Sequence, residues 1–286
     1  KTVGGTGKLG PGAVTNNGTL YANSPALGTG EVVNNAGCSL YLNAPLLDSG
    51  RLVNKGTVYG PSVLQTASSV VNSGTWNTYS GAIGTGALTN LNGGTINLYT
   101  NVFTYGQFVN GGTLGIWMPM TLADPMRFNG GSVSVNGTSN TLYMTGTVTT
   151  DTMASFGGTG TSVIEVSGQI SGPGGITRSG DGLCYVTGDA NDYTGPTVVN
   201  SGKSLWVGKP AGEANGRLGS GAITNSGMLY FDSASAYTGL KGLNGWGVTV
   251  VRYGGRLTFD GGVSSNYTMH VANGALTLTN DAMFST

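Results

Sequence analysis

The chain has 286 residues, of which 53 are Gly and only 8% are charged, and its formal net charge is zero. This composition excludes a helical protein, because helix surfaces draw on Glu, Lys, Ala and Leu, and it excludes collagen, in which Gly recurs at every third position. It also disfavours nucleic-acid binding, which needs a clustered basic face. Thr, Ser and Asn supply the polar residues, and these suit strands and turns. We therefore expect an all-β protein with many turns.

One pattern, Asn followed by any residue and Gly, recurs along the chain at a nearly constant spacing. Its glycines in the first half are Gly18, Gly37, Gly56, Gly74, Gly94, Gly112 and Gly131. Apolar residues then alternate with polar ones, as in Ile96/Leu98 and Val133/Val135, which is typical of a strand with one buried face. A unit of ~19 residues cannot bury that face alone and is too short for a propeller blade. Regular spacing also argues against a meander of hairpins, so the repeat predicts stacked coils of a β-helix.

The Asn of each repeat is expected at a corner of its coil. Asn tolerates the left-handed backbone of a sharp turn, and stacked Asn side chains can hydrogen-bond from one coil to the next. The predicted corner ladder consists of Asn16, Asn35, Asn54, Asn72, Asn92, Asn110, Asn129, Asn200 and Asn225.

Aromatic residues recur at a position that should point outward, three residues after the Gly, or four at Gly37 and Gly202, where the pattern slips by one residue. They predict two columns with rungs ~4.8 Å apart: Tyr21, Tyr41 and Tyr59, and later Tyr185, Trp206 and Tyr230. Such stacks can simply stabilise a sheet surface, by ~0.2–1 kcal/mol per pair. Exposed aromatic patches also mark interaction sites, so these residues are, as the less favoured interpretation, a candidate contact strip for a glycan, a neighbouring protein or a sister chain.

One segment fits a known repeat pattern in order. The matching residues are Gly175, Ile176, Thr177, Arg178, Gly180, Gly182, Gly188, Asn191, Tyr193, Thr194, Gly195, Thr197, Val199, Gly202 and Leu205. With them, residues 172–208 resemble the autotransporter-associated β-strand repeat, also called the passenger-associated transport repeat. Cys184 departs from the pattern, since Leu is usual there, and Leu205 comes one residue late. The resemblance implies a secreted bacterial surface protein with a right-handed parallel β-helix, and it brings no catalytic residues.

These observations together predict an all-β fold: a right-handed parallel β-helix, or solenoid, of about 14 coils with a ~19-residue period. We expect residues 1–286 to form a single β-helix segment of a longer surface polypeptide. The alternation in Leu276-Thr-Leu278 persists close to the last residue, so either the helix continues in further sequence or chains stack head to tail.

An enzyme is the alternative, because β-helices also carry polysaccharide lyases and hydrolases. The one dense acidic group is Asp181, Asp189 and Asp192, two of which fit turn chemistry. His270 is the only histidine, so we expect no catalytic or metal site and no cofactor. Cys38 and Cys184 should lie many coils apart, beyond the reach of a disulfide.

The function that we favour is therefore non-enzymatic: an extracellular or bacterial cell-surface element with a structural or adhesive role. The partners that fit it are a second copy, joined head to tail or laterally to form filaments or a surface layer, or a glycan or protein on a host or cell surface. Nucleic acid is not expected. The longest apolar stretch, residues 116–123, is interrupted by Pro119 and too short to span a membrane.

Overall fold

The chain folds as a β-solenoid in the computed structural model, which describes residues 2–3, 12–23, 30–43, 50–60, 69–79, 86–210, 213–232, 236–259 and 268–278. Its parallel sheets form about 11 turns with a period of ~20 residues. The expected all-β solenoid is confirmed, but the expected count of about 14 coils is too high, because several coils exceed 19 residues. Paired Thr197 and Ile223, for example, are separated by one coil of 26 residues. None of the described residues forms a helix long and apolar enough to cross a membrane.

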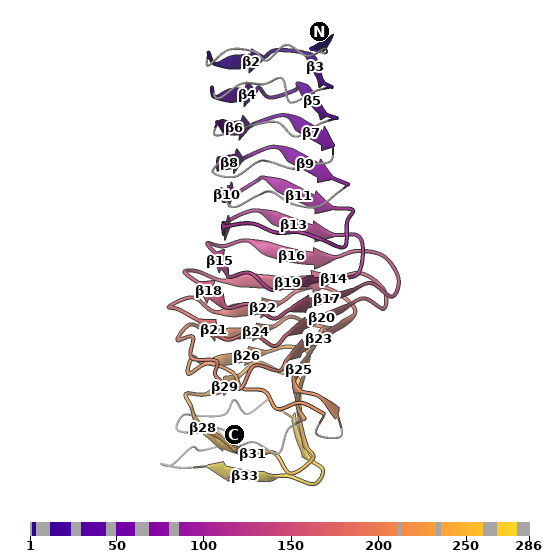
Figure 1. Cartoon of the computed structure of the whole chain (residues 1–286). Coiled ribbons are helices and arrows are strands. Elements are labelled where there is room, and N and C mark those ends of the chain that lie inside the picture. The colour runs from indigo at the N-terminus through magenta and orange to yellow at the C-terminus, as the bar shows by residue number, and fades with distance from the viewer. Residues whose placement is uncertain are drawn as a thin grey trace. The chain divides into compact units, whose positions relative to one another are not determined.

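The described residues divide into two compact units. Unit 1 comprises residues 1–127 and 131–133, and unit 2 comprises residues 128–130 and 134–286. Figure 1 shows the strands of each unit stacked coil upon coil.

Unit 1 contains two parallel sheets to which each coil contributes one strand apiece. The first sheet holds β1 (Thr2–Val3), β3 (Thr19–Ala22), β5 (Ser39–Leu42), β7 (Thr57–Gly60), β9 (Thr75–Thr78), β11 (Thr95–Leu98) and β13 (Thr113–Ile116). The second sheet holds β2 (Val14–Asn16), β4 (Val32–Asn34), β6 (Arg51–Asn54), β8 (Ser69–Asn72), β10 (Ala87–Asn90) and β12 (Gln107–Asn110). The strands near the division between the units are β14 (Met120–Leu122), β15 (Met126–Phe128) and β16 (Ser132–Val135).

Unit 2 has longer and less regular coils, with strands in four sheets. One sheet holds β17 (Thr141–Met144), β20 (Val163–Val166), β23 (Leu183–Val186), β25 (Ser204–Gly208), β27 (Met228–Asp232), β30 (Val248–Arg252) and β32 (Thr268–Val271). A second holds β19 (Ala154–Gly158), β22 (Ile176–Arg178), β24 (Thr197–Val199), β26 (Ile223–Asn225) and β29 (Leu243–Asn244). The others hold β18 (Val148–Thr150) with β21 (Ile170–Ser171), and β28 (Ala236–Leu240) with β31 (Arg256–Phe259) and β33 (Ala275–Leu278).

The apolar alternation of the sequence fills the interior of both units. Ile96 and Leu98 are completely buried on β11, and Leu229 and Phe231 on β27. Because neighbouring strands pair in parallel and in register, the same inward positions stack from coil to coil. The outward positions of the same strands therefore form columns as well, and these columns contain the candidate contact residues.

Candidate functional site

Tyr21, Tyr41 and Tyr59 form an outward column on β3, β5 and β7, as the sequence predicts; we call it the tyrosine column of unit 1. The three residues pair in register. Their ring centroids are 4.7 and 4.9 Å apart and the ring planes differ by 14° and 13°. These distances match the spacing of strands in a sheet, ~4.8 Å, so the rings stack along the direction in which the coils stack.

Tyr185, Trp206 and Tyr230 form the predicted second column, on β23, β25 and β27 of unit 2. The rings of Trp206 and Tyr230 stack with centroids 4.8 Å apart and planes only 4° apart. Tyr185 is tilted by 44° against Trp206, at 5.6 Å. The unit 2 column is thus less regular than the tyrosine column of unit 1.

Two cations lie over the ends of the unit 2 column. The Lys209 ammonium is 5.8 Å from the centre of the Tyr185 ring and 2.7 Å from a carboxylate oxygen of Glu165. The hydrogen bond to Glu165 raises the pKa of Lys209, and burial raises the pKa of the Tyr185 hydroxyl. Lys209 therefore stays charged, with its charge already matched by Glu165.

Arg252 closes the other end of the unit 2 column. Its guanidinium carbon lies 5.1 Å from the Tyr230 ring and 5.3 Å from the Tyr253 ring. Its Nε and Nη2 atoms donate to the two oxygens of the fully buried Asp232 carboxylate, at 2.7 and 2.6 Å. A bidentate pair of this kind fixes the plane of the guanidinium, so Arg252 is held against the Tyr230 ring.

The sequence analysis missed a third column, formed by Tyr79, Tyr99 and Trp117 in unit 1. Adjacent ring centroids are 5.1 and 5.4 Å apart, with planes 17° and 20° apart. Each residue lies five positions after a repeat glycine, at Gly74, Gly94 and Gly112. That constant offset was a usable signal, but only the position three residues after the glycine was considered.

The stacking limits what these columns can contact. In an offset stack at these distances each ring covers part of its neighbour's face. The edges of the rings are then the parts most open to a further contact. The columns are therefore better suited to meeting a flat surface than to stacking a sugar ring on an open aromatic face.

The corner asparagines of unit 1 form a continuous buried ladder. Each amide Nδ2 donates to the Oδ1 atom of the next Asn at 2.7–2.8 Å, and each also donates to a backbone carbonyl in the next coil. All members are at most 6% exposed. The asparagine ladder consists of Asn16, Asn34, Asn54, Asn72, Asn90 and Asn110.

The predictions for Asn35 and Asn92 were wrong. The ladder position is the last residue of the strand, which is Asn34 in β4 and Asn90 in β10. At these two corners the turn is two residues longer than at the other corners, and a glycine in it, Gly37 or Gly93, has a φ of 74° or 84°. The longer turn moves the Asn-x-Gly pattern out of phase with the ladder.

Asn129 and Asn200 are also outside the ladder, and both are exposed. The last residue of the strand before each of them is a buried apolar residue, Phe128 or Val199. Asn225 is buried at the end of β26, as predicted. Its amide donates to the Val248 carbonyl and accepts from the backbone of Gly227. It repeats the local geometry of a ladder residue within unit 2.

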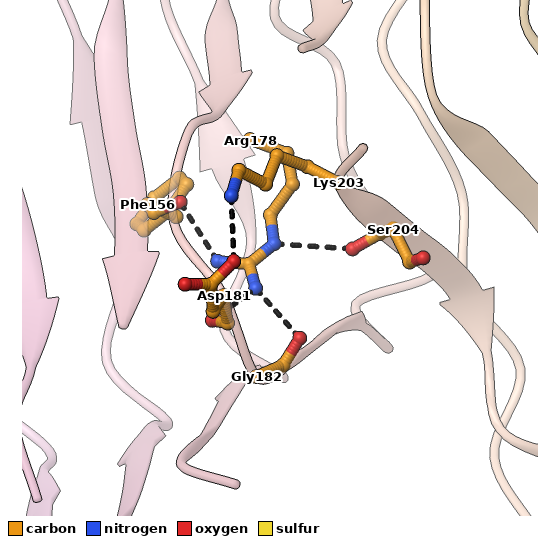
Figure 2. Close-up of polar contacts among 6 residues, drawn as sticks. All are labelled: Phe156, Arg178, Asp181, Gly182, Lys203 and Ser204. Carbon is orange, nitrogen blue, oxygen red and sulfur yellow. Dashed lines mark hydrogen bonds and ion pairs between the residues drawn. The ribbon is translucent and has the colours of Figure 1, made fainter. Parts of the chain in front are cut away.

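Arg178 occupies a corner of unit 2 and is only 2% exposed. Figure 2 shows its guanidinium among backbone carbonyl groups of three successive coils. It donates to Phe156 at 3.0 Å, to Ser204 at 3.1 Å, and to Asp181 and Gly182 within its own turn at 2.5 and 2.7 Å. A buried charge is tolerated only when its hydrogen bonds are made, and four carbonyls meet that need. Arg178 therefore joins its coil to the coils on either side.

The acidic group of the sequence, Asp181, Asp189 and Asp192, lies at exposed positions. Asp181 pairs with Lys203 at 2.6 Å (Figure 2), and this hydrogen bond lowers the pKa of Asp181. Among the described residues, no group of three or more His, Cys, Asp or Glu side chains could hold a metal ion.

The two cysteines are both free, as expected. Cys184 is fully buried, and burial raises the pKa of its thiol to about 11. Cys38 is half-buried, beside the turn at Gly37.

Comparison with known proteins gives no relative for this chain: no protein-family description matches it, and neither a curated protein nor a solved structure is significantly similar.

Proposed function

We propose that the chain is a non-enzymatic structural segment of an extracellular or bacterial surface protein, and that its outward aromatic columns serve as contact surfaces. The observation that carries this proposal is that the buried polar side chains of the chain bond to neighbouring coils. In both units these residues hold one coil to the next, as the asparagine ladder and Arg178 do.

The residues that carry the resemblance to the passenger repeat support the same function. Asn191 is buried, accepts from the backbone of Ile170, and donates to the carbonyls of Gly188 and Arg217. The buried Tyr193 hydroxyl lies 2.7 Å from the Thr197 hydroxyl. Polar residues fixed in this way stabilise the coil stack and leave little chemistry for a substrate.

The outer surface supports a contact role. Stacked aromatic residues are exposed at Tyr21, Tyr79 and Trp117, by 40%, 54% and 42%, and large exposed aromatic groups mark sites of interaction. The resemblance to the passenger repeat also supports an export route, since passengers of this kind are secreted across the outer membrane. The proposed location is therefore the cell surface or the extracellular medium.

The location can be tested on intact cells that produce the full polypeptide. A proteinase added outside should remove an epitope placed in this segment while a cytoplasmic marker stays intact. Protection of the epitope until the cells are lysed would contradict the proposed location.

The non-enzymatic role is tested separately, by incubating the purified chain with a panel of acidic polysaccharides. We expect no turnover. Turnover that disappears in Asp189→Asn or Asp192→Asn would favour a carbohydrate-active enzyme instead.

A further inference from the structure

The outward face of the first sheet in unit 1 presents three columns of side chains. The first column contains only hydroxyl groups: Thr19, Ser39, Thr57, Thr75, Thr95 and Thr113. The central column contains Tyr21, Tyr41, Tyr59, Asn77 and Asn97. The outer column contains Asn23, Asn43, Tyr79, Tyr99 and Trp117. None of the described residues in these columns is charged, and we call this surface the neutral face.

Aromatic and amide side chains exchange columns halfway along the neutral face. From β3 to β7 the central column is aromatic. On β9 and β11 it is amide and on β13 it is Gly115, while the outer column is aromatic on all three strands. The amides form short ladders of their own, from Asn43 to Asn23 at 2.6 Å and from Asn97 to Asn77 at 2.9 Å. The Trp117 indole donates to Asn97 at 3.3 Å.

This exchange makes the neutral face complementary to itself. Consider a two-fold axis that runs parallel to the strands and passes between β7 and β9. Rotation about it places Tyr59 opposite Asn77 of a second copy, and Tyr41 opposite Asn97. In the outer column the same rotation places Asn43 opposite Tyr99 and Asn23 opposite Trp117. Four of the six large rings then meet a smaller amide, and Tyr21 lies opposite Gly115, which has no side chain.

We propose that the neutral face binds the same face of a second copy of this chain, with the two solenoid units antiparallel. A two-fold contact of this kind is closed and uses the same patch on both copies. It gives the lateral self-association that a structural surface protein needs, and it rests on the structural function proposed above.

A second copy fits the neutral face better than a sugar polymer does, for two reasons. A second copy has the same coil spacing, so contacts stay in register along the whole face. An uncharged face can also approach itself without repulsion, and the formal net charge of the chain is zero. Each amide of the face has a second N–H and a further lone pair, which can bond across the interface.

The size of the face indicates a weak dimer. Six coils at ~4.8 Å and three columns at ~6.6 Å give roughly 570 Å² per copy, or about 1,100 Å² in total. That area is near the lower limit for a specific protein interface. We therefore expect association at roughly micromolar or higher concentrations of the chain.

The test is sedimentation of the purified 286-residue chain over a wide concentration series, together with two charged variants. Tyr41→Lys and Asn97→Glu each place a charge against an uncharged group of the partner, and each variant alone should dimerise at least tenfold more weakly. Mixed together, the two variants should form a heterodimer, because the new Lys and Glu then face each other. Within one chain these positions are three coils, or ~14 Å, apart, so a contact inside one chain cannot produce this rescue.

The control is Asn92→Glu, which places the same charge at an exposed corner away from the face and should leave the dimer unchanged. Circular dichroism of each variant confirms that it is folded. A monomer at every concentration, or two variants that weaken the dimer without rescue on mixing, would overturn the proposed pairing. A monomer that is retained on a neutral polysaccharide would assign the face to a glycan instead. Neither result bears on the non-enzymatic function, which the polysaccharide assay tests independently.

Discussion

Units 1 and 2 have the same fold but join their coils by different means. In unit 1 the corner residue is the same in six successive coils, and a single hydrogen-bonding pattern repeats from Asn16 to Asn110. In unit 2 the corner positions of β19, β22, β24 and β26 are Phe156, Arg178, Val199 and Asn225. Phe156 packs edge-on against Phe128, whereas Arg178 and Asn225 form hydrogen bonds that differ from each other.

The difference follows from the length of the coils. Ladder residues in unit 1 are separated by 18 or 20 residues, and their amides remain close enough to bond. In unit 2 the paired strands are up to 26 residues apart, and the longer loops bring different groups to each corner. A regular period permits one residue type to serve every coil, whereas an irregular period needs individual contacts.

The largest loss of stability is expected at Arg178, because this single side chain joins three coils of unit 2. Arg178→Ala removes a donor from four carbonyls and leaves a buried volume empty, so it should lower the free energy of unfolding by about 3–5 kcal/mol. Urea unfolding measures this loss. Arg217→Ala, at an exposed position, is the control and should change stability by less than about 0.5 kcal/mol. Equal effects of the two substitutions would show that Arg178 does not hold the coils together.

A smaller loss of stability is expected in unit 1, because six ladder residues make the same kind of hydrogen bond and one substitution removes only part of them. Asn34→Ala removes the donor to Asn54 and leaves Asn16 without its acceptor in β4, and it should lower the free energy of unfolding by about 2–3 kcal/mol. The adjacent Asn35→Ala removes only an exposed amide contact to Asn17 and should have an effect below about 0.5 kcal/mol. The reverse order would place the ladder at Asn35, as the repeat pattern first indicated.

The buried thiol of Cys184 in unit 2 should make the stability of the fold depend on pH in the alkaline range. The pKa of Cys184 is raised to about 11 by burial, while the unfolded thiol ionises near pH 9. The unfolded chain therefore loses its proton first, and stability falls as pH rises from about 9 to 11. At pH 10 this loss amounts to about 1 kcal/mol.

The measurement is the free energy of unfolding at pH 8 and at pH 10. The contribution of Cys184 to the decrease between the two should be absent in Cys184→Ala, even if the substitution also changes stability equally at both pH values. A thiol reagent should also label Cys38 in the folded chain and leave Cys184 unmodified. Rapid labelling of both cysteines would contradict the buried position of Cys184.

The smallest contribution to stability is expected from the ion pair of Asp181 and Lys203, which lies on the surface of unit 2. The hydrogen bond from Lys203 lowers the pKa of Asp181, so its stabilising contribution is present above the pKa of the unfolded chain and is lost as pH falls through the folded value. Carboxyl titration by NMR should show a pKa below the usual range, which returns toward it in Lys203→Met. An unchanged pKa in that variant would mean that the pair does not form in solution.

Much of the fold follows from the period and the alternation of the sequence, because inward positions such as Ile96 and Leu98 need only be apolar. The exact ladder could not be predicted, since Asn34 and Asn35 are both Asn and only the length of the turn decides which one is buried. The role of Arg178 could not be predicted from the sequence either, because its four acceptors are backbone carbonyls and every residue has one. The column of Tyr79 could have been found from its constant offset.

The most direct test of the account is hydrogen exchange at the side-chain amides of unit 1, followed by NMR. The ladder amides of Asn34, Asn54, Asn72 and Asn90 are buried and bonded at both ends, so their protons should exchange orders of magnitude more slowly than those of the exposed Asn92. Equally fast exchange at all five amides would contradict the ladder, and with it the claim that buried polar side chains hold the coils together.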